Sequence, residues 1–268
     1  MRVRVTFKVN NKGAAIPFHH QFLIAQILKG LVVASGADQY NNYPYYSFSG
    51  LKGLTKVSRE GLHYNSNRVT IVLTSPNASF VDFMINKIFE QDEIAIGSLV
   101  ISPESVDQEL SVDFGEMTKF ICISPLVLLP ASFNSNEGKQ FIEPGTDEFS
   151  DLLFESTVKR MEEYGIDVDS IDNLQKFQVV PDLAYINKIR QSQKKFARVY
   201  SMFDRDVKYE VRGYTFPFML YAPAEVQEFL FTCGLGHYSH KGFGMLDIAN
   251  SDPTKRAVGY AVSSLISA

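Results

Sequence analysis

Hydrophobic residues recur at every second position from Val3 to Val9, with polar residues between them. A period of two is typical of a β-strand with one buried face, because successive side chains of a strand point to opposite sides. The polar positions include Arg2 and Arg4, so the pattern predicts a strand over residues 2–9 whose outer face is exposed and basic.

The rest of the first half alternates between helical spacing and strand-like runs. Residues 19–33 place apolar side chains three and four positions apart, and the Ser35–Gly36 pair ends this pattern as helices commonly end. The next segments fit two strands, a helix and a strand, over residues 45–51, 68–74, 80–89 and 93–101. With the first strand, the order β-α-β-β-α-β is that of a ferredoxin-like domain.

A looser copy of this order follows in the second half. Its segments fit a strand, a helix, two paired strands, a helix and a strand, over residues 119–129, 148–164, 194–203, 208–220, 223–233 and 245–249. We therefore predict an α+β protein with two tandem ferredoxin-like (RRM-like, βαββαβ) domains. The predicted divisions are an N-terminal domain over 1–110, a C-terminal domain over 111–250, and a tail over 251–268 whose apolar end fits a short helix.

Composition narrows the class of protein. The chain has 268 residues, of which 45% are hydrophobic, enough for the core of one large or two small soluble domains. The two cysteines lie in apolar stretches far apart in the sequence, so we expect buried free thiols and a reducing, cytoplasmic location. No apolar run reaches the roughly 18 residues of a membrane span and no signal peptide is predicted, so we expect no membrane partner.

Four glycines are concentrated in residues 234–244, as two Gly-x-Gly pairs around a polar, partly basic centre. They are Gly234, Gly236, Gly242 and Gly244, and the residues between them include His237, His240 and Lys241. The predicted order helix, loop, strand is the reverse of that in nucleotide-binding glycine loops. Two interpretations stay open: a tight connection between two elements, or a loop that lays backbone N–H groups, histidines and a lysine against a phosphate chain.

Basic residues gather in one segment, although the formal net charge of the whole chain is −4. Residues 188–212 contain eight lysines and arginines against three acids, a net charge of +5. The candidates for RNA contact there are Lys194, Lys195 and Arg198, and those for base stacking are Tyr200, Tyr209 and Tyr214. A solvated hairpin is the simpler explanation of such charge. Together with Arg2, Arg4 and Lys241, however, the segment favours a path for RNA.

Four motifs in this order resemble those of the RAMP proteins of CRISPR systems, and are most similar to their repeat-processing endoribonucleases. The motifs are Ile16–Phe22, Tyr46–Ser49, Phe120–Leu126 and the glycine-rich residues 234–244. The resemblance extends along nearly the whole chain. It implies metal-independent cleavage of CRISPR precursor RNA within its repeats, in which a ribose 2′-hydroxyl attacks the adjacent phosphate and leaves a 2′,3′-cyclic phosphate and a 5′-hydroxyl. No metal or other cofactor is expected.

The implied reaction needs a general base, a general acid and a cation near the phosphorane. Many members of the family carry a tyrosine late in the first helix, a histidine about fifteen residues on, and a lysine before the second strand. Here the tyrosine position falls on Lys29, and residues 38–45 contain no histidine. The candidates are therefore His20 or His19 as base or acid, with Lys29, Tyr40 and Lys52 as orienting or charge-stabilising groups.

The two histidines at the start of the first predicted helix are adjacent, so their side chains diverge by about 100°. His20 lies three and seven positions before Leu23 and Ile27, on the apolar stripe. We therefore expect His20 to be enclosed and His19 to lie nearer solvent. The pattern favours His20 as the catalytic imidazole, and packing beneath the loop is the alternative role for this side chain.

Two other functions stay open beside the endoribonuclease. The missing histidine is compatible with an inactive RNA-binding paralogue, or with a structural subunit of a CRISPR ribonucleoprotein. A nucleotide-binding ferredoxin-like regulator is disfavoured by the orientation of the glycine loop and by the basic segment. The expected partner is CRISPR repeat RNA, while other subunits of a CRISPR complex and a second copy of the chain in a homodimer are left open.

Overall fold

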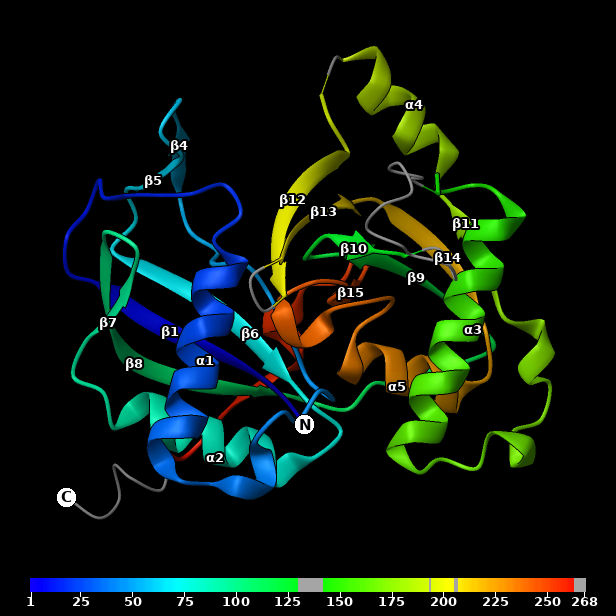
Figure 1. The fold of residues 1–268 in the computed structure, drawn as a ribbon, viewed down its shortest axis with the longest axis horizontal. Helices are drawn as coiled ribbons and strands as arrows, with labels where there is room; N and C mark the ends of the chain where they lie inside the picture. Colours follow the sequence, from blue (N-terminus) through cyan, green and yellow to red (C-terminus); the bar gives the residue numbers. More distant parts are fainter. Residues whose placement is uncertain (130–141, 193, 205–206, 263–268) are drawn as a thin grey trace. The chain divides into compact units, whose positions relative to one another are not determined.

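The protein folds into two compact units (Figure 1). The computed structural model describes residues 1–129, 142–192, 194–204 and 207–262. The first unit holds residues 1–111, 240–242 and those from 252 onward, and the second holds residues 112–239 and 243–251. Each unit is built around its own antiparallel sheet.

The sheet of the first unit is centred on its first strand. In spatial order its strands are β16 (Ala257–Gly259), β8 (Leu99–Glu109), β1 (Arg2–Val9), β6 (Arg68–Thr74) and β3 (Ser47–Phe48), with β7 (Ile94–Ile96) paired to β8. The helices α1 (Gln21–Ser35) and α2 (Ala78–Phe89) lie against one face of this sheet (Figure 1). Counting β1, β3, β6 and β8 as the four strands of the motif gives the spatial order 4-1-3-2, and the connections are those of a ferredoxin-like fold.

The alternation in β1 buries the side chains expected from the sequence. Val3, Val5 and Phe7 are at most 2% exposed, and they belong to a core that also contains Ile24 and Leu28 of α1. Gly36 ends α1 in a left-handed conformation, as the sequence predicts. Asn77 caps α2 by accepting a hydrogen bond from the Phe80 N–H.

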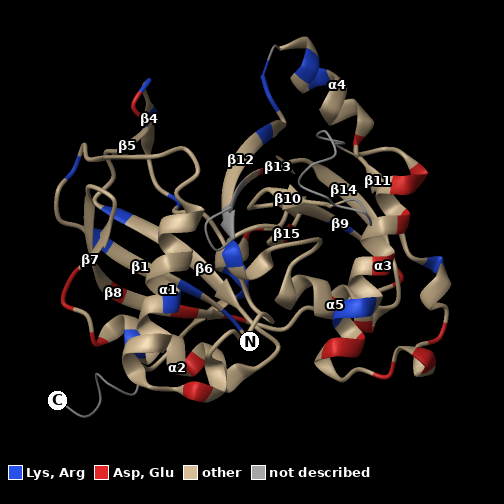
Figure 2. Cartoon of the chain, in the orientation of Figure 1, with Lys and Arg blue, Asp and Glu red and all other residues tan. Residues whose placement is uncertain are grey.

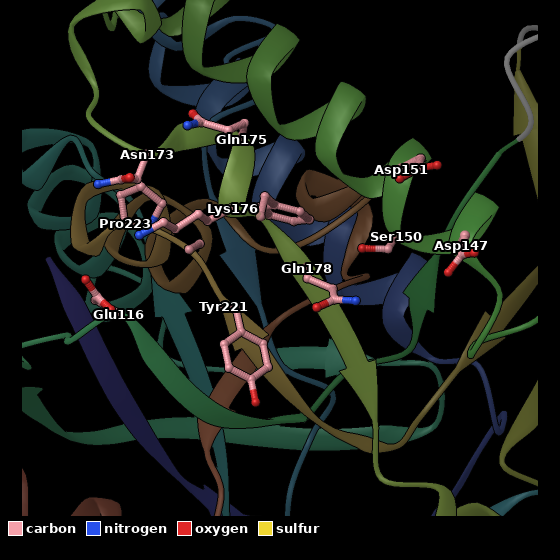
Figure 3. Close-up of a pocket in the computed structure, with 12 residues that line it drawn as sticks. Glu116, Asp147, Ser150, Asp151, Asn173, Gln175, Lys176, Gln178, Tyr221 and Pro223 are labelled. Carbon is pink, nitrogen blue, oxygen red and sulfur yellow. The ribbon is translucent and has the colours of Figure 1, made fainter.

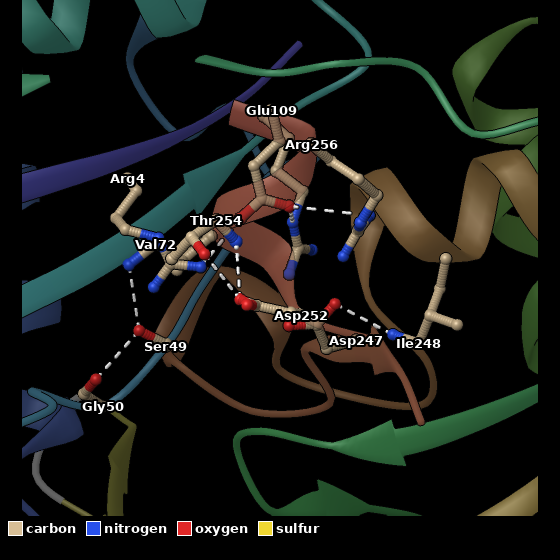
Figure 4. Close-up of polar contacts among 11 residues, drawn as sticks. Arg4, Ser49, Gly50, Val72, Glu109, Asp247, Ile248, Asp252, Thr254 and Arg256 are labelled. Atoms are coloured by element: carbon tan, nitrogen blue, oxygen red, sulfur yellow. Dashed lines mark hydrogen bonds and ion pairs between the residues drawn. The ribbon is translucent and has the colours of Figure 1, made fainter. Parts of the chain in front are cut away.

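The other face of β1 differs from the prediction of an exposed basic surface. Arg2 is only 4% exposed, and its Nε donates to Glu109 at 2.8 Å. Arg4 donates to the second oxygen of Glu109 at 3.0 Å, and Arg256 lies 3.9 Å from the same carboxylate (Figure 4). A buried cation needs such a partner. The prediction that Arg2 and Arg4 form an exposed basic face is therefore wrong, because these arginines hold Glu109 together with Arg256 from the tail.

The tail contributes to the first unit rather than standing apart from it. After the short helix η5 (Pro253–Arg256), β16 pairs with β8, and Tyr260 donates a hydrogen bond from its hydroxyl to Asp82 on α2. The buried side chain of Val262 belongs to the core of this unit. Residues 263–268, on which most of the expected short helix falls, lie outside the described residues.

Three shorter elements form a second sheet in the first unit. They are β2 (Ala15–Ile16), β5 (Leu62–Tyr64) and β4 (Thr55–Val57), in the spatial order β2-β5-β4. The short helix η1 (Asp38–Tyr40) follows α1, and carries Tyr40.

The second unit repeats the same topology. Its sheet has the order β11 (Gln178–Pro181), β14 (Pro217–Tyr221), β9 (Met117–Cys122) and β15 (Leu246–Ile248), and its main helices are α3 (Asp147–Tyr164) and α5 (Ala224–Cys233). In chain order the elements are β9-α3-β11-β14-α5-β15, so this unit is also ferredoxin-like. Both cysteines are buried free thiols, as expected.

The second unit differs from the prediction in the strands that form its ferredoxin-like sheet, although the two predicted paired strands do pair. The basic segment forms the hairpin β12 (Ala197–Asp204) and β13 (Val207–Tyr214), which continues to β10 (Leu126–Val127) in a separate sheet. The second strand of the ferredoxin-like motif is instead β11, followed by the helix α4 (Leu183–Gln191). The predicted strand over 208–220 is two strands, because residues 215 and 216 separate β13 from β14.

Candidate nucleic-acid interface

The glycine loop begins where α5 ends and leads into β15. Its four glycines have positive φ angles of 80°, 77°, 88° and 66° at positions 234, 236, 242 and 244, and all four are buried. A Cβ atom on Gly236 would lie 2.5 Å from the Val127 carbonyl oxygen, and one on Gly244 would lie 1.9 Å from that of Leu235. Glycine is therefore required by the packing of the loop on its own protein.

Several backbone amides of the loop are used inside the protein. The Leu235 N–H donates to the Gly244 carbonyl, and the Gly244 N–H donates to that of Pro125, both at 2.8 Å. The His237 N–H donates to Val127, also at 2.8 Å. These donors cannot also hold a phosphate, so the interpretation that the glycines open the backbone to RNA does not hold at these positions. The side chains of the loop remain as candidates.

Arg160, on α3, joins the parts of the loop that lie in the second unit. One terminal nitrogen, Nη1, donates to the carbonyl oxygens of Gly234 at 2.8 Å and Gly236 at 3.1 Å. The other, Nη2, donates to the Cys233 carbonyl oxygen at 2.9 Å and to Ser239 Oγ at 3.2 Å. The sequence does not indicate a role for Arg160, because nothing in the pattern of α3 distinguishes it from the neighbouring charged residues.

The two histidines of the loop have different surroundings. Burial, with smaller contributions from Arg160 and Lys159, lowers the pKa of His237 to about 4, so this imidazole is neutral at physiological pH and brings no positive charge. His240 and Lys241 form part of the short helix η4 (Ser239–Lys241) and are half-buried in the first unit. There the ring of His240 lies 6.5 Å from that of Tyr46.

Gly242 packs tightly within the first unit. A Cβ atom at this position would lie 2.7 Å from the ring of Phe48 and 2.9 Å from Gln21 Cβ, at the start of α1. Any larger side chain would push against the strand β3 and the first turn of the helix. The tip of the loop thus belongs to the same unit as the two candidate histidines at the start of α1.

The structure confirms that His20 is enclosed and His19 exposed. His20 is 4% exposed, and both of its ring nitrogens have backbone partners: Nδ1 lies 3.2 Å from the Pro17 carbonyl oxygen, and Nε2 lies 3.0 Å from the Leu51 nitrogen. Because Pro17 offers only an acceptor, Nδ1 carries the proton and Nε2 accepts from the Leu51 N–H. This arrangement gives His20 a structural role, as a tie between the start of α1 and the segment after β3.

The pKa of His20 makes a testable prediction about stability. Burial lowers this pKa from 6.5 to about 4; the Pro17 hydrogen bond opposes the shift and His19 adds to it. The unfolded chain takes up the proton near pH 6.5 and the folded protein only near pH 4, so acidification through this window favours unfolding. We expect His20 to remove up to about 3 kcal/mol of stability between pH 7 and pH 4.

Urea denaturation at a series of pH values measures this effect, with His20→Gln as the matched variant that cannot titrate. The variant should lose less stability than the wild type as the pH falls from 7 to 4. Equal losses in the two proteins would show that His20 does not contribute to the acid sensitivity.

The remaining catalytic candidates, Lys29, Tyr40 and Lys52, have different surroundings. Lys29 is exposed on α1. Tyr40 packs in an aromatic cluster, with its ring 5.2 Å from Phe80 and 4.9 Å from Phe83 of α2, which is a core position. Lys52 is half-buried, and its backbone pairs with Thr70 next to the Leu51 amide that His20 binds. The His20 side chain and the Lys52 backbone therefore lie close to each other.

The start of the β12–β13 hairpin presents positive charge. Lys194, Lys195 and Arg198 are exposed, and Figure 2 shows basic residues along α4 and the segment that leads into β12. Arg205 of the same segment lies outside the described residues.

The tyrosines of the hairpin are less available for base stacking than the sequence predicts. Tyr200 is 7% exposed and packs edge-on against Phe243 at 5.2 Å, and Tyr214 is 3% exposed. The expectation that these two tyrosines stack on bases is wrong, because their side chains lie on the buried faces of their strands. Exposed rings lie elsewhere: Phe18 and Phe22, beside His19, are 36% and 41% exposed, although the helical spacing predicts that Phe22 faces the core.

A pocket of about 640 Å³ in the second unit has different chemistry (Figure 3). Its charged lining consists of Glu116, Asp147, Asp151 and Lys176, and none of the candidates from the sequence lines it. Three carboxylates against one ammonium would repel a phosphate chain. The pocket is therefore not a candidate for the RNA site.

Across the described residues, no three His, Cys, Asp or Glu side chains form a group that could hold a metal ion. Within the same part of the chain, no helix combines the length and the apolar character needed to cross a membrane.

The chain has two ferredoxin-like folds, and a glycine-rich loop joins the last helix of the second unit to its last strand, which is the arrangement expected from the resemblance to RAMP proteins. The sequence model of one family, described as CRISPR associated protein Cas6, C-terminal, matches residues 107–248, which is more than half of the chain. The chain belongs to this family. A search of curated protein sequences finds no match.

Solved structures share the fold at low sequence identity. One, described as the characterization of a Cas6-related gene from Pyrococcus furiosus, has 19% identity and a TM-score of 0.75, and the alignment covers 94% of this chain and 99% of the other. A RAMP protein described as binding different RNA substrates has 18% identity and a TM-score of 0.75, with 93% and 100% covered. A CRISPR associated protein Cas6 has 17% identity and a TM-score of 0.72, with 93% and 99% covered.

Proposed function

We propose that this protein binds CRISPR repeat RNA and cleaves it within the repeat by attack of the ribose 2′-hydroxyl. The observation that carries the proposal is the family match over residues 107–248, which contain both the glycine loop and the basic hairpin. The RNA-binding activity described for one of the structures with the same fold supports the choice of ligand.

The proposed reaction needs no bound metal, because the nucleophile belongs to the substrate. A base removes the 2′-hydroxyl proton, the 2′ oxygen bonds to phosphorus, the bond from phosphorus to the 5′ oxygen breaks, and an acid protonates that oxygen. The products are a 2′,3′-cyclic phosphate and a 5′-hydroxyl. Lys194, Lys195 and Arg198 are proposed to hold the RNA backbone, together with His240 and Lys241 of the glycine loop.

His19 is the histidine that we assign to proton transfer. It is exposed at the start of α1, and its ring lies 5.9 Å from that of the exposed Phe22. An imidazole beside an aromatic ring can reach a phosphate while a neighbouring base stacks on the ring. His20 is less suited to this role, because both of its nitrogens are engaged by the backbone.

One observation favours a second candidate function, repeat-RNA binding without cleavage. The sequence pattern favoured His20 as the catalytic imidazole, and the hydrogen bonds of His20 give it a structural role instead. If His19 does not transfer protons, the protein would hold its RNA as a paralogue or complex subunit without activity.

Cleavage of a cognate repeat RNA in EDTA tests the proposed reaction. We expect cleavage without added metal, and none when the nucleotide 5′ of the cut carries a 2′-deoxy sugar, because the nucleophile is then missing. Binding of both RNAs without cleavage of either would support the second candidate. An absolute requirement for Mg²⁺, or cleavage of the deoxy substrate, would exclude the proposed mechanism.

A further inference from the structure

Arg160 donates hydrogen bonds to backbone carbonyl oxygens at the end of α5 and the start of the glycine loop. Cys233 is the last residue of α5, and the final carbonyls of a helix have no intrahelical donor and carry partial negative charge. The Arg160 guanidinium, on α3, donates to the Cys233 carbonyl oxygen and also lies 5.7 Å from the ring of Phe229, on α5. One cation therefore fixes the end of α5 and the loop that leaves it.

The four hydrogen atoms on the Arg160 terminal nitrogens are matched by four protein oxygens. Three of these are backbone carbonyls between positions 233 and 236, and the fourth is the hydroxyl of Ser239. A planar guanidinium can satisfy such a spread of acceptors, whereas a single ammonium cannot do so with the same geometry. These interactions point the charge of Arg160 toward the protein rather than toward a phosphate.

The loop that Arg160 holds contains a strained residue. Tyr238 has a φ of 64°, which is uncommon for a residue other than glycine. Such a conformation persists only where its surroundings hold it. Arg160 holds the next residue, Ser239, from α3, and the Tyr238 hydroxyl accepts a hydrogen bond from Tyr209 of β13 at 3.1 Å. The loop is thus fixed from two sides at the point where the chain continues to His240 and Lys241.

We propose that Arg160 is a positioning residue for RNA binding, which holds the glycine loop in the form that presents His240 and Lys241 to the RNA. The inference rests on the proposed function, because it assumes that the loop contacts repeat RNA. It assigns no catalytic role to Arg160, and it makes the guanidinium, rather than the glycines alone, responsible for the shape of the loop.

The adjacent residue offers a matched control. Lys159 is exposed on α3, and its ammonium lies 4.0 Å from Glu163. Lys159→Gln and Arg160→Gln each remove one positive charge from the same turn of α3, and only the second removes the hydrogen bonds to the loop. A difference between the two variants therefore reports the hydrogen bonds and not the charge.

The experiment measures three properties of Arg160→Gln, Arg160→Lys and Lys159→Gln: affinity for a cognate repeat RNA, the single-turnover cleavage rate at saturating protein, and amide hydrogen exchange without RNA. Arg160→Gln should weaken binding at least about tenfold, as expected for one lost charge-assisted hydrogen bond. Lys159→Gln should change it less than about threefold, because the charge of Lys159 is exposed to solvent and screened by salt. The saturated rate should change little, since the loop holds substrate and transition state alike.

Hydrogen exchange should rise in Arg160→Gln at the amides of residues 235, 237 and 244, and not elsewhere. Arg160→Lys should fall between the wild type and Arg160→Gln in both exchange and affinity. If Arg160→Gln does not fold, the RNA affinity and amide exchange of Arg160→Lys are compared with those of Lys159→Gln, and the same criteria apply. Equal affinities of the position-160 and position-159 variants, or unchanged exchange in the loop, would overturn this inference alone. Failure of the wild type to bind repeat RNA would instead overturn the proposed function.

Discussion

Replacement of His19 by alanine is expected to lower the single-turnover cleavage rate by about 10²–10⁴-fold, the usual loss when a general acid or base is removed. His19 is the exposed member of the histidine pair at the start of α1, and its neighbour His20 is occupied by two backbone partners. RNA affinity should change little, because the variant keeps the lysines of the hairpin. The measurement is cleavage of a cognate repeat RNA with protein in saturating excess.

The matched comparison is His20→Gln, whose amide can donate to the Pro17 carbonyl and accept from the Leu51 N–H in place of the imidazole. This variant should cleave at close to the wild-type rate once folded. His20→Ala leaves both backbone groups buried without those partners, at a cost of about 1–3 kcal/mol for each. A folded His20→Gln protein with a hundredfold slower rate, beside an active His19→Ala protein, would reverse the assignment and restore His20 as the catalytic imidazole.

Much of the fold follows from patterns that are local in the sequence. The alternation from Val3 to Val9 predicts β1 because each apolar side chain needs to reach the same core. Gly36 and Gly165 end α1 and α3 in left-handed conformations, as their positions after helical patterns indicate. The order of these elements was enough to predict two ferredoxin-like domains, which the strand order confirms.

Short elements carry too little pattern to be found in the same way. The strand β11 has four residues and ends at Pro181, so it shows neither a full alternation nor an apolar run. The pattern over residues 208–220 predicts a single strand. In the structure, Thr215 and Phe216 separate two strands that belong to different sheets. Which strands pair with which depends on contacts made after the chain has folded, and the sequence of a strand does not specify them.

At the candidate site, burial follows from local sequence patterns, whereas hydrogen-bond partners far along the chain do not. Helical spacing predicts that His20 is enclosed, and this is confirmed. Its role, however, depends on an amide 31 residues away, at Leu51. Arg160 is a stronger case, because its partners lie 73 to 79 residues further along the chain. In a single sequence, a half-buried arginine with distant acceptors looks like any other charged residue of an amphipathic helix.

Gly244→Ala is expected to lower the free energy of unfolding by at least about 3 kcal/mol, the scale of a side chain forced into both a left-handed conformation and a backbone clash. The new Cβ would lie 1.9 Å from the Leu235 carbonyl oxygen, and moving it away would disturb the hydrogen bond from the Leu235 N–H to the Gly244 carbonyl. Gly30→Ala is the control, because Gly30 is exposed in α1 with nothing within 4 Å of its Cβ position; alanine there should stabilise the protein by about 1 kcal/mol. Urea denaturation of both variants gives the two free energies. If Gly244→Ala kept the wild-type stability and lost only RNA affinity, the glycines would serve the approach of RNA, which is one of the two interpretations of the sequence, and not the packing of the loop.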